Sequence, residues 1–397
     1  MPKVLRIINR LNLGGPTFNA AYLSKFQAPE FETLLLSGEH DATEASSEFI
    51  VNQLGLSPKY VKGMGREISP VKDRKAYKYI RQVIREYQPD IVHTHAAKAG
   101  ALGRLAAHHE KVPIILHTFH GHVFHSYFHP AKTQAFLQIE RYLARKSTRI
   151  IAISRLQKKE LTEDFNICPA DKMEIIPLGF DLDRFQENIE EKRLSFRAEF
   201  QVKPKEVAIG IIGRLVPIKN HSLFLHALKS VLNRAQTPIK AFIVGDGELR
   251  NSLELEAKLL EIPYSKETDA SHGEPLVFTS WRKDIDRINA GLDVIALTSK
   301  NEGTPVSLIE AQAANKPIVS TRVGGIEDIV QEGIGALLSD SEDVETLGNN
   351  MLQLVEDQEL RTRMGVNGYE FVRKAFSYQR LVKDMNQLYK QLLTEKD

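Results

Sequence analysis

Residues 294–330, VIALTSKNEGTPVSLIEAQAANKPIVSTRVGGIEDIV, hold the pattern that decides the fold. An apolar run at 294–297 is short enough to be one buried strand, and a second short strand is predicted at 317–320. Between them, Pro305 opens an apolar-periodic segment that predicts a helix to the region of Ala314, because proline suits the first helical position. The order strand, helix, strand predicts a parallel crossover unit and therefore an α/β fold.

Two carboxylates frame the predicted helix. Glu302 precedes the helix, and Glu310 lies about one and a half turns inside it. Free N–H groups at a helix start can hold an anion such as a diphosphate. Glu302 and Glu310 can then accept hydrogen bonds from hydroxyls on either side of that anion, which suits a nucleotide sugar. Taken alone, such a pair is more often two solvated surface residues.

The same stretch resembles a specific family signature. From Glu302 to Gly325 the chain reads EGTPVSLIEAQAANKPIVSTRVGG, which is similar to the E-x7-E motif of retaining glycosyltransferases of the large family 4 type. The resemblance covers nearly the whole chain and implies the GT-B fold. In that fold, two Rossmann-like α/β domains face a central cleft, and a C-terminal helix crosses back to the N-terminal domain.

The predicted elements divide the chain into four parts. Strand patterns lie on both sides of a charge-dense segment at 187–197, at residues 4–8, 31–37, 89–94, 112–118, 147–153, 207–212 and 241–244. We expect an acceptor-binding Rossmann-like domain at 1–180, a linker at 181–204, a nucleotide-sugar-binding Rossmann-like domain at 205–376 and a C-terminal helix at 377–397. An apolar stripe marks one face of that helix: Leu381, Val382, Met385, Leu388, Tyr389, Leu392 and Leu393.

Two cations follow the predicted strand at 207–212. Arg214 and Lys219 flank a turn ahead of a helix pattern, where Arg binds an anion in a bidentate manner and Lys acts as a point charge. In the resembled family, cations at these positions hold the donor diphosphate. The expected diphosphate-binding residues are Gly15, Arg214, Lys219, Val306 and Ser307.

The resemblance also implies residues around the donor sugar and the nucleoside. The family carries a Thr-x-His at the end of a strand in the first domain, and Thr118-Phe119-His120 matches it. That histidine approaches the reacting centre, so catalytic roles are expected for His120 and Glu302. The expected donor-sugar residues are His120, Glu302, Gly303, Thr304 and Pro305, and the expected nucleoside-binding residues are Glu310, Trp281 and Arg282. For Trp281, structural packing is the alternative.

A glycine loop follows the first predicted strand. It reads Leu11-Asn12-Leu13-Gly14-Gly15-Pro16, which is not G-x-G-x-x-G, so no dinucleotide site is predicted. In the family this loop lies near the diphosphate and the acceptor, and an acidic residue often follows the glycines. Here Pro16-Thr17-Phe18-Asn19 follows, which is a departure from the family. The expected acceptor-binding residues are Gly14, Thr17, His122 and Tyr127, with packing as the alternative for each aromatic or histidine.

Histidines gather in the first third of the chain. Five of the thirteen lie between His117 and His129, so a zinc site has to be weighed. Their spacing repeats no known zinc pattern, no cysteine is near, and the chain has no Asp-x-Asp motif. We therefore expect no metal and no cofactor, with cations and helix ends neutralising the diphosphate.

Composition indicates an ordinary globular protein. Of 397 residues, 42% are hydrophobic and 26% are charged, and the single cysteine, Cys168, favours a reducing compartment. Residues 1–180 hold 25 Lys and Arg against 17 Asp and Glu, whereas 181–397 hold 28 against 34. A basic first half favours an anionic partner, such as a membrane surface, with chance unevenness as the alternative. We expect a cytoplasmic protein, peripheral on the inner face of the membrane, without a spanning helix, a signal peptide or a nucleic-acid partner.

These patterns together predict an enzyme. We expect a retaining glycosyltransferase of the hexosyltransferase type, which moves a sugar from UDP or GDP to a hydroxyl of a glycan or lipid-linked acceptor in bacterial cell-surface polysaccharide or glycolipid synthesis. The alternatives are a nucleotide-sugar hydrolase or epimerase on the same fold, and an inactive nucleotide-sugar-binding subunit. The oligomeric state does not follow from the sequence.

Overall fold

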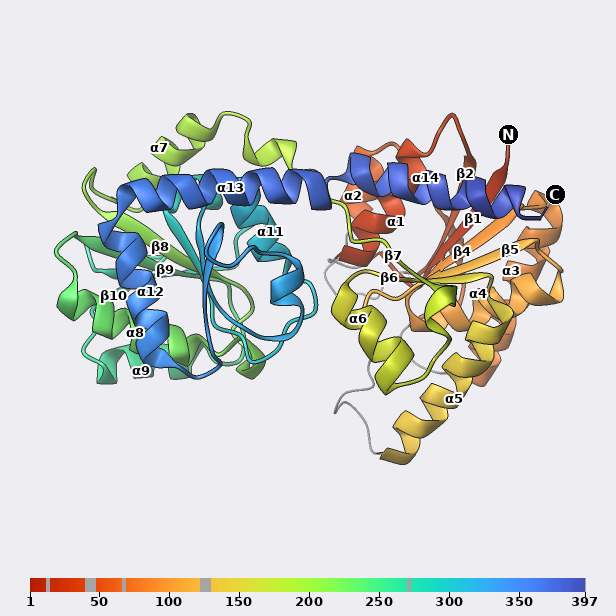
Figure 1. The fold of residues 1–397 in the computed structure, drawn as a ribbon, viewed down its shortest axis with the longest axis horizontal. Helices are drawn as coiled ribbons and strands as arrows, with labels where there is room; N and C mark the ends of the chain where they lie inside the picture. Colours follow the sequence, from red (N-terminus) through yellow and green to blue (C-terminus); the bar gives the residue numbers. More distant parts are fainter. Residues whose placement is uncertain (12–14, 40–47, 66–68, 122–129, 270–272, 397) are drawn as a thin grey trace. The chain divides into compact units, whose positions relative to one another are not determined.

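The computed structural model describes residues 1–11, 15–39, 48–65, 69–121, 130–269 and 273–396. The chain forms two compact units, one made of Met1–Phe180 with Phe376–Asp397 and the other of Asp181–Ala375. Each unit has a seven-stranded parallel sheet with helices packed on it (Figure 1). The predicted α/β class with two Rossmann-like units is therefore confirmed.

The first unit has the strand order β3-β2-β1-β4-β5-β6-β7. Its strands are β1 (Lys3–Ile8), β2 (Glu32–Gly38), β3 (Lys59–Val61), β4 (Ile91–His95), β5 (Ile114–Thr118), β6 (Arg149–Ala152) and β7 (Met173–Ile175). β1 pairs with β2 on one side and with β4 on the other, and Ile8 lies opposite His95 in the second pair. The sheet first grows on one side of β1, through β2 and β3, and β4 then pairs on the other side of β1. This reversal places a topological switch point at the carboxyl ends of β1 and β4.

Helices cover both faces of this sheet because both faces of its strands are apolar. Leu5 and Ile7 of β1 pack in a cluster with residues of α3 (Pro70–Tyr87) and α4 (Ala97–His109). Val4, on the opposite face, packs with residues of α1 (Gly15–Phe26) and of the C-terminal helix α14 (Tyr378–Thr394). The described part of the unit also contains the α-helices α2 (Glu48–Gln53), α5 (Pro130–Lys146) and α6 (Arg155–Lys159). Ser154 caps α6, because its Oγ accepts from the Gln157 N–H at 3.0 Å.

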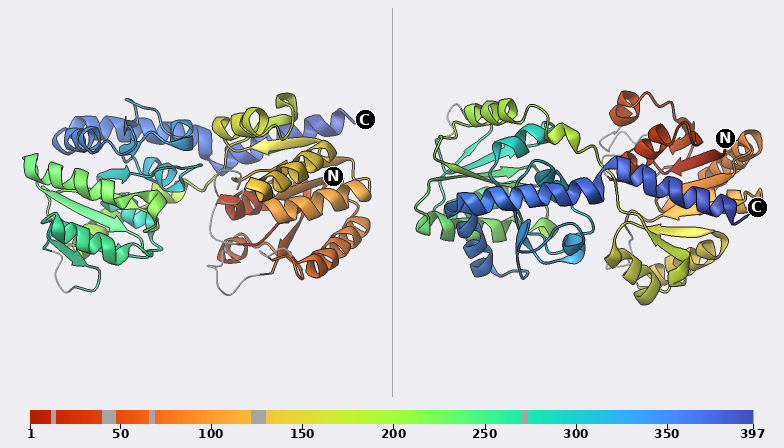
Figure 2. Two further views of the ribbon diagram at one scale, coloured as in Figure 1. Left: turned by 90° about the horizontal axis from the view of Figure 1, so that it is seen from below. Right: turned by 45° about the horizontal axis from the view of Figure 1, so that its top comes forward.

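The C-terminal helix belongs to the first unit. α14 buries Leu381, Met385, Leu388, Tyr389 and Leu392. Both views in Figure 2 show this helix lying along the first unit. The Tyr389 hydroxyl contacts Arg6 Nη2 at 2.9 Å and His93 Nδ1 at 2.6 Å. The C-terminal helix therefore positions the side chains of Arg6 on β1 and His93 on β4, although it is distant from both in the sequence.

The second unit has the strand order β10-β11-β9-β8-β12-β13-β14. Its strands are β8 (Val207–Ile212), β9 (Ile239–Val244), β10 (Tyr264–Lys266), β11 (Leu276–Ser280), β12 (Val294–Leu297), β13 (Ile318–Thr321) and β14 (Ala336–Ser339). The helices are α7 (Ile189–Glu199), α8 (His221–Arg234), α9 (Arg250–Leu259), α10 (Ile285–Gly291), α11 (Val306–Ala313), α12 (Val344–Glu356) and α13 (Gln358–Phe376). The crossover from β12 through α11 to β13 is the one that the sequence predicted.

Alternate residues of β8 face different helices. Ile209 and Ile211 join a cluster with residues of α8, α9 and α12. Gly210 faces the other way, where a Cβ would lie 2.3 Å from Leu292 Cδ1, so a larger residue would require the Leu292 side chain to shift. On the same side, Phe196 of α7 is fully buried, and its ring centroid lies 5.1 Å from that of Phe242. The segment expected as a linker, 181–204, therefore contributes a helix to the core of the second unit.

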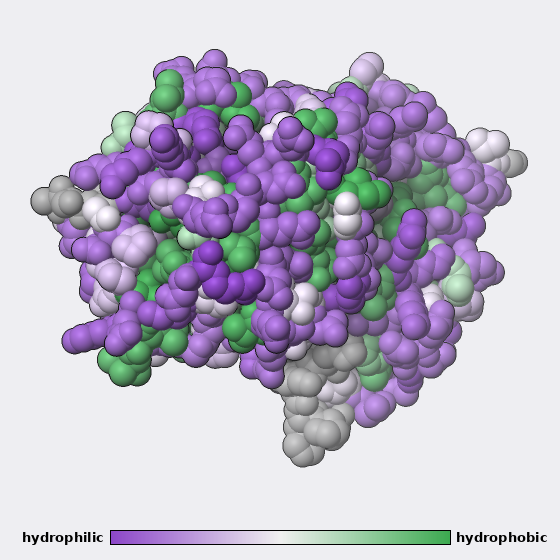
Figure 3. Space-filling view, turned by 60° about the vertical axis from the view of Figure 1, so that its left-hand side comes forward, coloured by the Kyte–Doolittle hydropathy of each residue, from purple (hydrophilic) through white to green (hydrophobic). Residues whose placement is uncertain are grey.

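The face of the molecule in Figure 3 is mostly hydrophilic. On the face in Figure 3, hydrophobic residues lie in separate groups among hydrophilic ones. None of the helices in the described ranges is long and apolar enough to cross a membrane.

Candidate functional site

The two sheets have equivalent switch points, and in the second unit three predicted site residues follow the strands that form this point. In the second unit β8 pairs with β9 on one side and with β12 on the other. Arg214 and Lys219 follow β8, and Glu302 follows β12. Parallel strands place their carboxyl ends on one edge of the sheet, so the structure brings these residues to the same crevice.

Lys219 and Glu302 are in direct contact. Lys219 Nζ lies 2.5 Å from Glu302 Oε1, and the Ser299 hydroxyl donates to the same oxygen at 2.5 Å. The two charged side chains are 22% and 10% exposed, so water screens their attraction only in part. Thr298 Oγ1 donates to the carbonyl of Asn220 at 2.9 Å, which ties the lysine-bearing turn to the end of β12.

Two glycines after β13 hold the Glu302 loop. Gly324 has φ +55°, and a Cβ there would lie 2.0 Å from the Glu302 carbonyl oxygen. A Cβ on Gly325 would lie 1.9 Å from the Gly303 carbonyl oxygen, and the Gly325 N–H donates to the Glu302 carbonyl at 2.9 Å. Only glycine permits this approach of two backbones. The sequence analysis missed this support, although the Gly-Gly pair was the signal that could have revealed it.

Helix α11 places the remaining residues of the E-x7-E motif. Pro305 stands at the N-cap and the helix begins at Val306, one residue later than predicted. Glu310 is the fifth helical residue, and its Oε1 accepts from Arg184 Nη2 at 3.0 Å. Burial raises the pKa of Glu310 to about 7, against the opposing effect of the Arg184 charge. The two glutamates of the motif therefore differ in environment: Glu302 pairs with Lys219, and Glu310 pairs with Arg184.

A second pair of close backbone approaches shapes the turn that carries Arg214. A Cβ on Gly245 would lie 2.0 Å from the Gly213 carbonyl oxygen, and one on Gly247 would lie 2.5 Å from the Leu215 carbonyl oxygen. The loop after β9 therefore presses against the loop after β8. The Arg214 side chain is exposed at this edge. An exposed guanidinium beside the start of α8 is available to an anionic ligand.

The two residues expected near the nucleobase differ in accessibility. Trp281 is 62% exposed, an unusual state for a tryptophan, and it directly follows β11. Arg282 is only 13% exposed, and its guanidinium pairs with Glu199, Glu267 and Asp284. These pairs occupy donors of Arg282 within the unit, and its expected nucleoside contact stays a prediction.

In the first unit, His120 lies just beyond β5 among buried imidazoles. His95 is fully buried, and its Nδ1 lies 2.9 Å from His120 Nε2. Burial lowers the pKa of His120 to about 3, so this imidazole is neutral at neutral pH. A neutral ring can donate or accept a hydrogen bond but carries no charge toward a ligand.

Hydrogen bonds also determine which ring nitrogen of the neighbouring His93 carries the hydrogen. Arg6 Nη2 donates to the Tyr389 oxygen, so the Tyr389 hydroxyl hydrogen is free to donate to His93 Nδ1. His93 Nε2–H then donates to Thr118 Oγ1 at 2.8 Å. The series of hydrogen bonds from Arg6 through Tyr389 and His93 to Thr118 therefore anchors the first residue of the Thr-x-His segment.

The residues expected to bind the acceptor differ in their surroundings. Thr17 is 1% exposed within α1, so its side chain is turned into the core and the expected acceptor contact is not supported. Gly15 is the first residue of α1, where a Cβ would lie 2.8 Å from Leu178 Cδ1. Gly14, His122 and Tyr127 lie outside the described residues.

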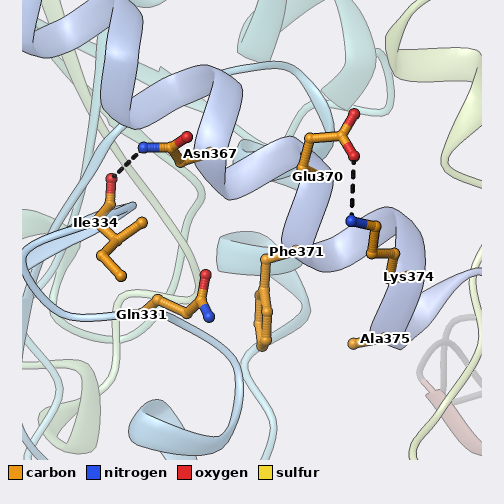
Figure 4. Close-up of a pocket in the computed structure, with 7 residues that line it drawn as sticks. All are labelled: Gln331, Ile334, Asn367, Glu370, Phe371, Lys374 and Ala375. Atoms are coloured by element: carbon orange, nitrogen blue, oxygen red, sulfur yellow. Dashed lines mark hydrogen bonds and ion pairs between the residues drawn. The ribbon is translucent and has the colours of Figure 1, made fainter.

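No group of three or more His, Cys, Asp or Glu side chains within the described ranges is placed to hold a metal ion. Part of the histidine-rich segment lies outside those ranges, and the expectation of metal independence stays a prediction. A pocket of about 400 Å³ lies elsewhere in the second unit. Figure 4 shows the residues that line it. They are Gln331, Ile334, Asn367, Glu370, Phe371, Lys374 and Ala375, none of which is a predicted site residue.

Comparisons with known proteins identify one matching family for most of each unit. Residues 192–371 match the family described as "Glycosyl transferases group 1", and residues 23–184 match "Glycosyltransferase Family 4". A relative from Escherichia coli, UDP-Gal:alpha-D-GlcNAc-diphosphoundecaprenol alpha-1,3-galactosyltransferase, is 30% identical over 334 residues, which is 82% of this chain and 83% of the relative. The capsular polysaccharide biosynthesis glycosyltransferase CapM of Staphylococcus aureus is 24% identical over 344 residues, 84% of this chain and 85% of CapM.

Solved structures show the same fold. HepE from Anabaena, solved in complex with UDP, has a TM-score of 0.81 at 18% identity, with 98% of this chain and 100% of that chain covered. The lipopolysaccharide outer core galactosyltransferase WaaB has a TM-score of 0.71 at 14% identity, with 98% and 99% covered. At these identities the likeness concerns the fold alone.

Proposed function

The chain belongs to the group 1 and family 4 glycosyltransferases, and from this premise we propose that it transfers a hexose from a UDP-hexose, with retention of configuration, to a hydroxyl of a lipid-linked glycan. The protein is a glycosyltransferase. Its donor, its stereochemistry and its acceptor are the finer parts of the proposal.

One observation carries the donor assignment. Lys219 and Glu302 meet at the edge of the sheet where α11 begins, and Glu310 lies one turn further along that helix. A cation and a helix N-terminus suit a diphosphate, and a carboxylate on each side suits sugar and ribose hydroxyls. In the proposed complex, Arg214 and Lys219 neutralise the departing diphosphate, Glu302 binds the donor sugar and Glu310 binds the ribose.

The proposed chemistry needs little from protein acids and bases. A neutral His120 binds a sugar hydroxyl near the reacting centre, since its lowered pKa rules out an imidazolium at neutral pH. Cations and helix N–H groups stabilise the negative charge that grows on the leaving diphosphate. The leaving phosphate oxygen then assists removal of the acceptor proton on the same face of the sugar, which gives retention.

The relative from Escherichia coli suggests the first substrates to test. Its name gives UDP-galactose as donor and a GlcNAc-diphospholipid as acceptor. We extend both to this chain as proposals. CapM, which is named for capsular polysaccharide synthesis, supports a role in cell-surface polysaccharide or glycolipid synthesis.

We place the proposed membrane contact on α3. The exposed charges of this helix are mostly basic, with Glu86 as the exposed acid against five cations: Lys72, Arg74, Lys75, Lys78 and Arg85. Val71 at its start is 69% exposed and Tyr79 is 36% exposed, so apolar groups accompany the charges. Basic residues with exposed apolar neighbours suit the surface of an anionic bilayer.

A donor screen tests the proposal. Release of the nucleoside diphosphate is measured for UDP-galactose, UDP-glucose and GDP-mannose, with and without a GlcNAc-diphospholipid in anionic vesicles. The expected result is release from a UDP-hexose that depends on the lipid, with the donor's anomeric configuration kept in the product by NMR. Release independent of the lipid would indicate a hydrolase, and UDP binding without any turnover would indicate a binding subunit.

A further inference from the structure

An arginine outside the E-x7-E motif contacts its second glutamate. Arg184 lies in the short 3-10 helix Asp183–Phe185, just after the chain enters the second unit. Its Nη2 lies 3.0 Å from Glu310 Oε1, and its guanidinium carbon lies 4.7 Å from the centre of the Phe185 ring. The Arg184 carbonyl also accepts from Lys192 Nζ at 2.7 Å, which anchors the segment to α7.

Glu310 needs such a partner because of where it lies. Its side chain is 17% exposed, and burial favours its neutral form. Arg184 is the charged group that opposes this effect, whereas Asp286 on α10 adds to it. Asp286 is itself paired with Lys192 at 2.8 Å. Among the described residues, Arg184 is the only cation within ion-pair distance of Glu310.

We propose that Arg184 is a positioning residue, which fixes the Glu310 carboxylate so that it accepts hydrogen bonds from the two ribose hydroxyls of the donor. This inference rests on the proposed assignment of Glu310 to the ribose. Arg184 occupies one carboxylate oxygen and restricts rotation of the group, while the second oxygen keeps its lone pairs for the vicinal diol. An amide or a neutral acid at position 310 would accept these bonds less strongly.

The test separates the ribose hydroxyls from the rest of the nucleotide. The wild type and Arg184→Gln are titrated with UDP and with 2′,3′-dideoxy-UDP by calorimetry. We expect Arg184→Gln to weaken UDP by about tenfold or more, the effect of one charged hydrogen bond, and to change the dideoxy ligand much less. Arg184→Lys, which keeps the charge but not the fork, should recover part of the UDP affinity.

Controls distinguish positioning from folding. Arg373→Gln removes an exposed arginine that pairs with Glu370 on α13, and it should leave both affinities unchanged. Thermal melting of each variant reports any loss of fold, and Arg184→Lys carries the test if Arg184→Gln is unstable. Equal weakening of UDP and the dideoxy ligand would mean a merely structural role and would overturn the inference.

The same titrations separate this inference from the function on which it rests. If the wild type prefers UDP to the dideoxy ligand and Glu310→Gln abolishes that preference, the ribose assignment stands. An unchanged preference in Arg184→Gln would then overturn the role of Arg184 alone. A wild type that binds no UDP, or does not distinguish the two ligands, would overturn the ribose assignment and the inference together.

Discussion

Lys219 Nζ lies 2.5 Å from Glu302 Oε1, so the cation proposed for the diphosphate and the carboxylate proposed for the sugar form one ion pair. Each charge lowers the cost of holding the other in a partly buried crevice. When a donor binds, its diphosphate and the Glu302 carboxylate must both interact with Lys219. Mutations at the two positions should therefore not act independently.

The first prediction concerns the cations. Arg214→Ala and Lys219→Ala should each weaken UDP by roughly 1.5–3 kcal/mol, the usual effect of losing a hydrogen bond to a charged group. Lys219→Ala should be the more harmful, because it leaves Glu302 as an uncompensated negative charge near the diphosphate. Adding Glu302→Gln to Lys219→Ala should recover part of the loss. Calorimetry checks this, and unchanged affinity in both single variants would remove these residues from the site.

The second prediction separates the two glutamates. Glu310→Gln should weaken both UDP and the UDP-hexose, because the ribose is common to them. Glu302→Gln should leave UDP binding equal or tighter, since it frees Lys219, but should lower the rate of transfer. An acid and base pair of the glycosidase type would behave otherwise, with chemistry lost in both variants and UDP binding intact. Titration with UDP and measurement of turnover decide between the two patterns.

The third prediction concerns the glycine beneath the Glu302 loop. Gly324→Ala should slow transfer by on the order of a hundredfold, because its Cβ would displace a loop that positions the donor sugar. Gly333→Ala is a matched control: Gly333 has φ +72° with no atom within 4 Å of its Cβ, against φ +55° and a 2.0 Å contact at Gly324. Both substitutions pay roughly 1–2 kcal/mol of backbone strain. Similar activity in the two variants would show that the close approach is unimportant.

The fourth prediction concerns metal. Turnover of the UDP-hexose should survive incubation with EDTA, because Arg214, Lys219 and the start of α11 supply the positive charge for the diphosphate. The rate is compared before and after chelation and after return of Mg²⁺ or Zn²⁺. Loss of activity that either ion restores would count against this arrangement and would favour a metal site in the histidine-rich segment.

The fifth prediction concerns stability and pH. Burial raises the pKa of Glu310 from 4.5 to about 7 in the folded protein, so the folded state binds this proton more tightly than the unfolded chain. The stability linked to this group is complete below pH 4.5 and is lost as the pH rises through 7. The loss is about 3 kcal/mol at most, for a shift of this size at 1.36 kcal/mol per pKa unit.

Glu310→Gln removes that titration. Its melting temperature relative to the wild type, without ligand, should therefore be higher at pH 8 than at pH 5. The pKa of about 7 already includes the opposing effect of Arg184, so the loss of this pair does not reduce the difference between the two pH values further. The same difference in melting temperature at both pH values would contradict the raised pKa.

Much of the fold could be predicted from local patterns. The strands β8 and β12 are continuous apolar runs, because a parallel strand with helices on both faces has no polar side. The stripe of α14 likewise predicted a helix with one buried face. The short edge strands β3, β10 and β14 escaped prediction, because three or four residues with mixed polarity carry too little periodic signal.

By itself, the sequence determined the α/β class, the crossover from β12 to β13 and the identity of the two motif glutamates, because these depend on patterns within a few tens of residues. Only the tertiary structure decided their partners. Lys219 meets Glu302 from 83 positions away, and Arg184 meets Glu310 from 126. The tertiary structure also buries Thr17 and pairs Arg282 with three carboxylates. Such contacts depend on how loops at the edge of a sheet approach one another, which no local pattern of polarity records.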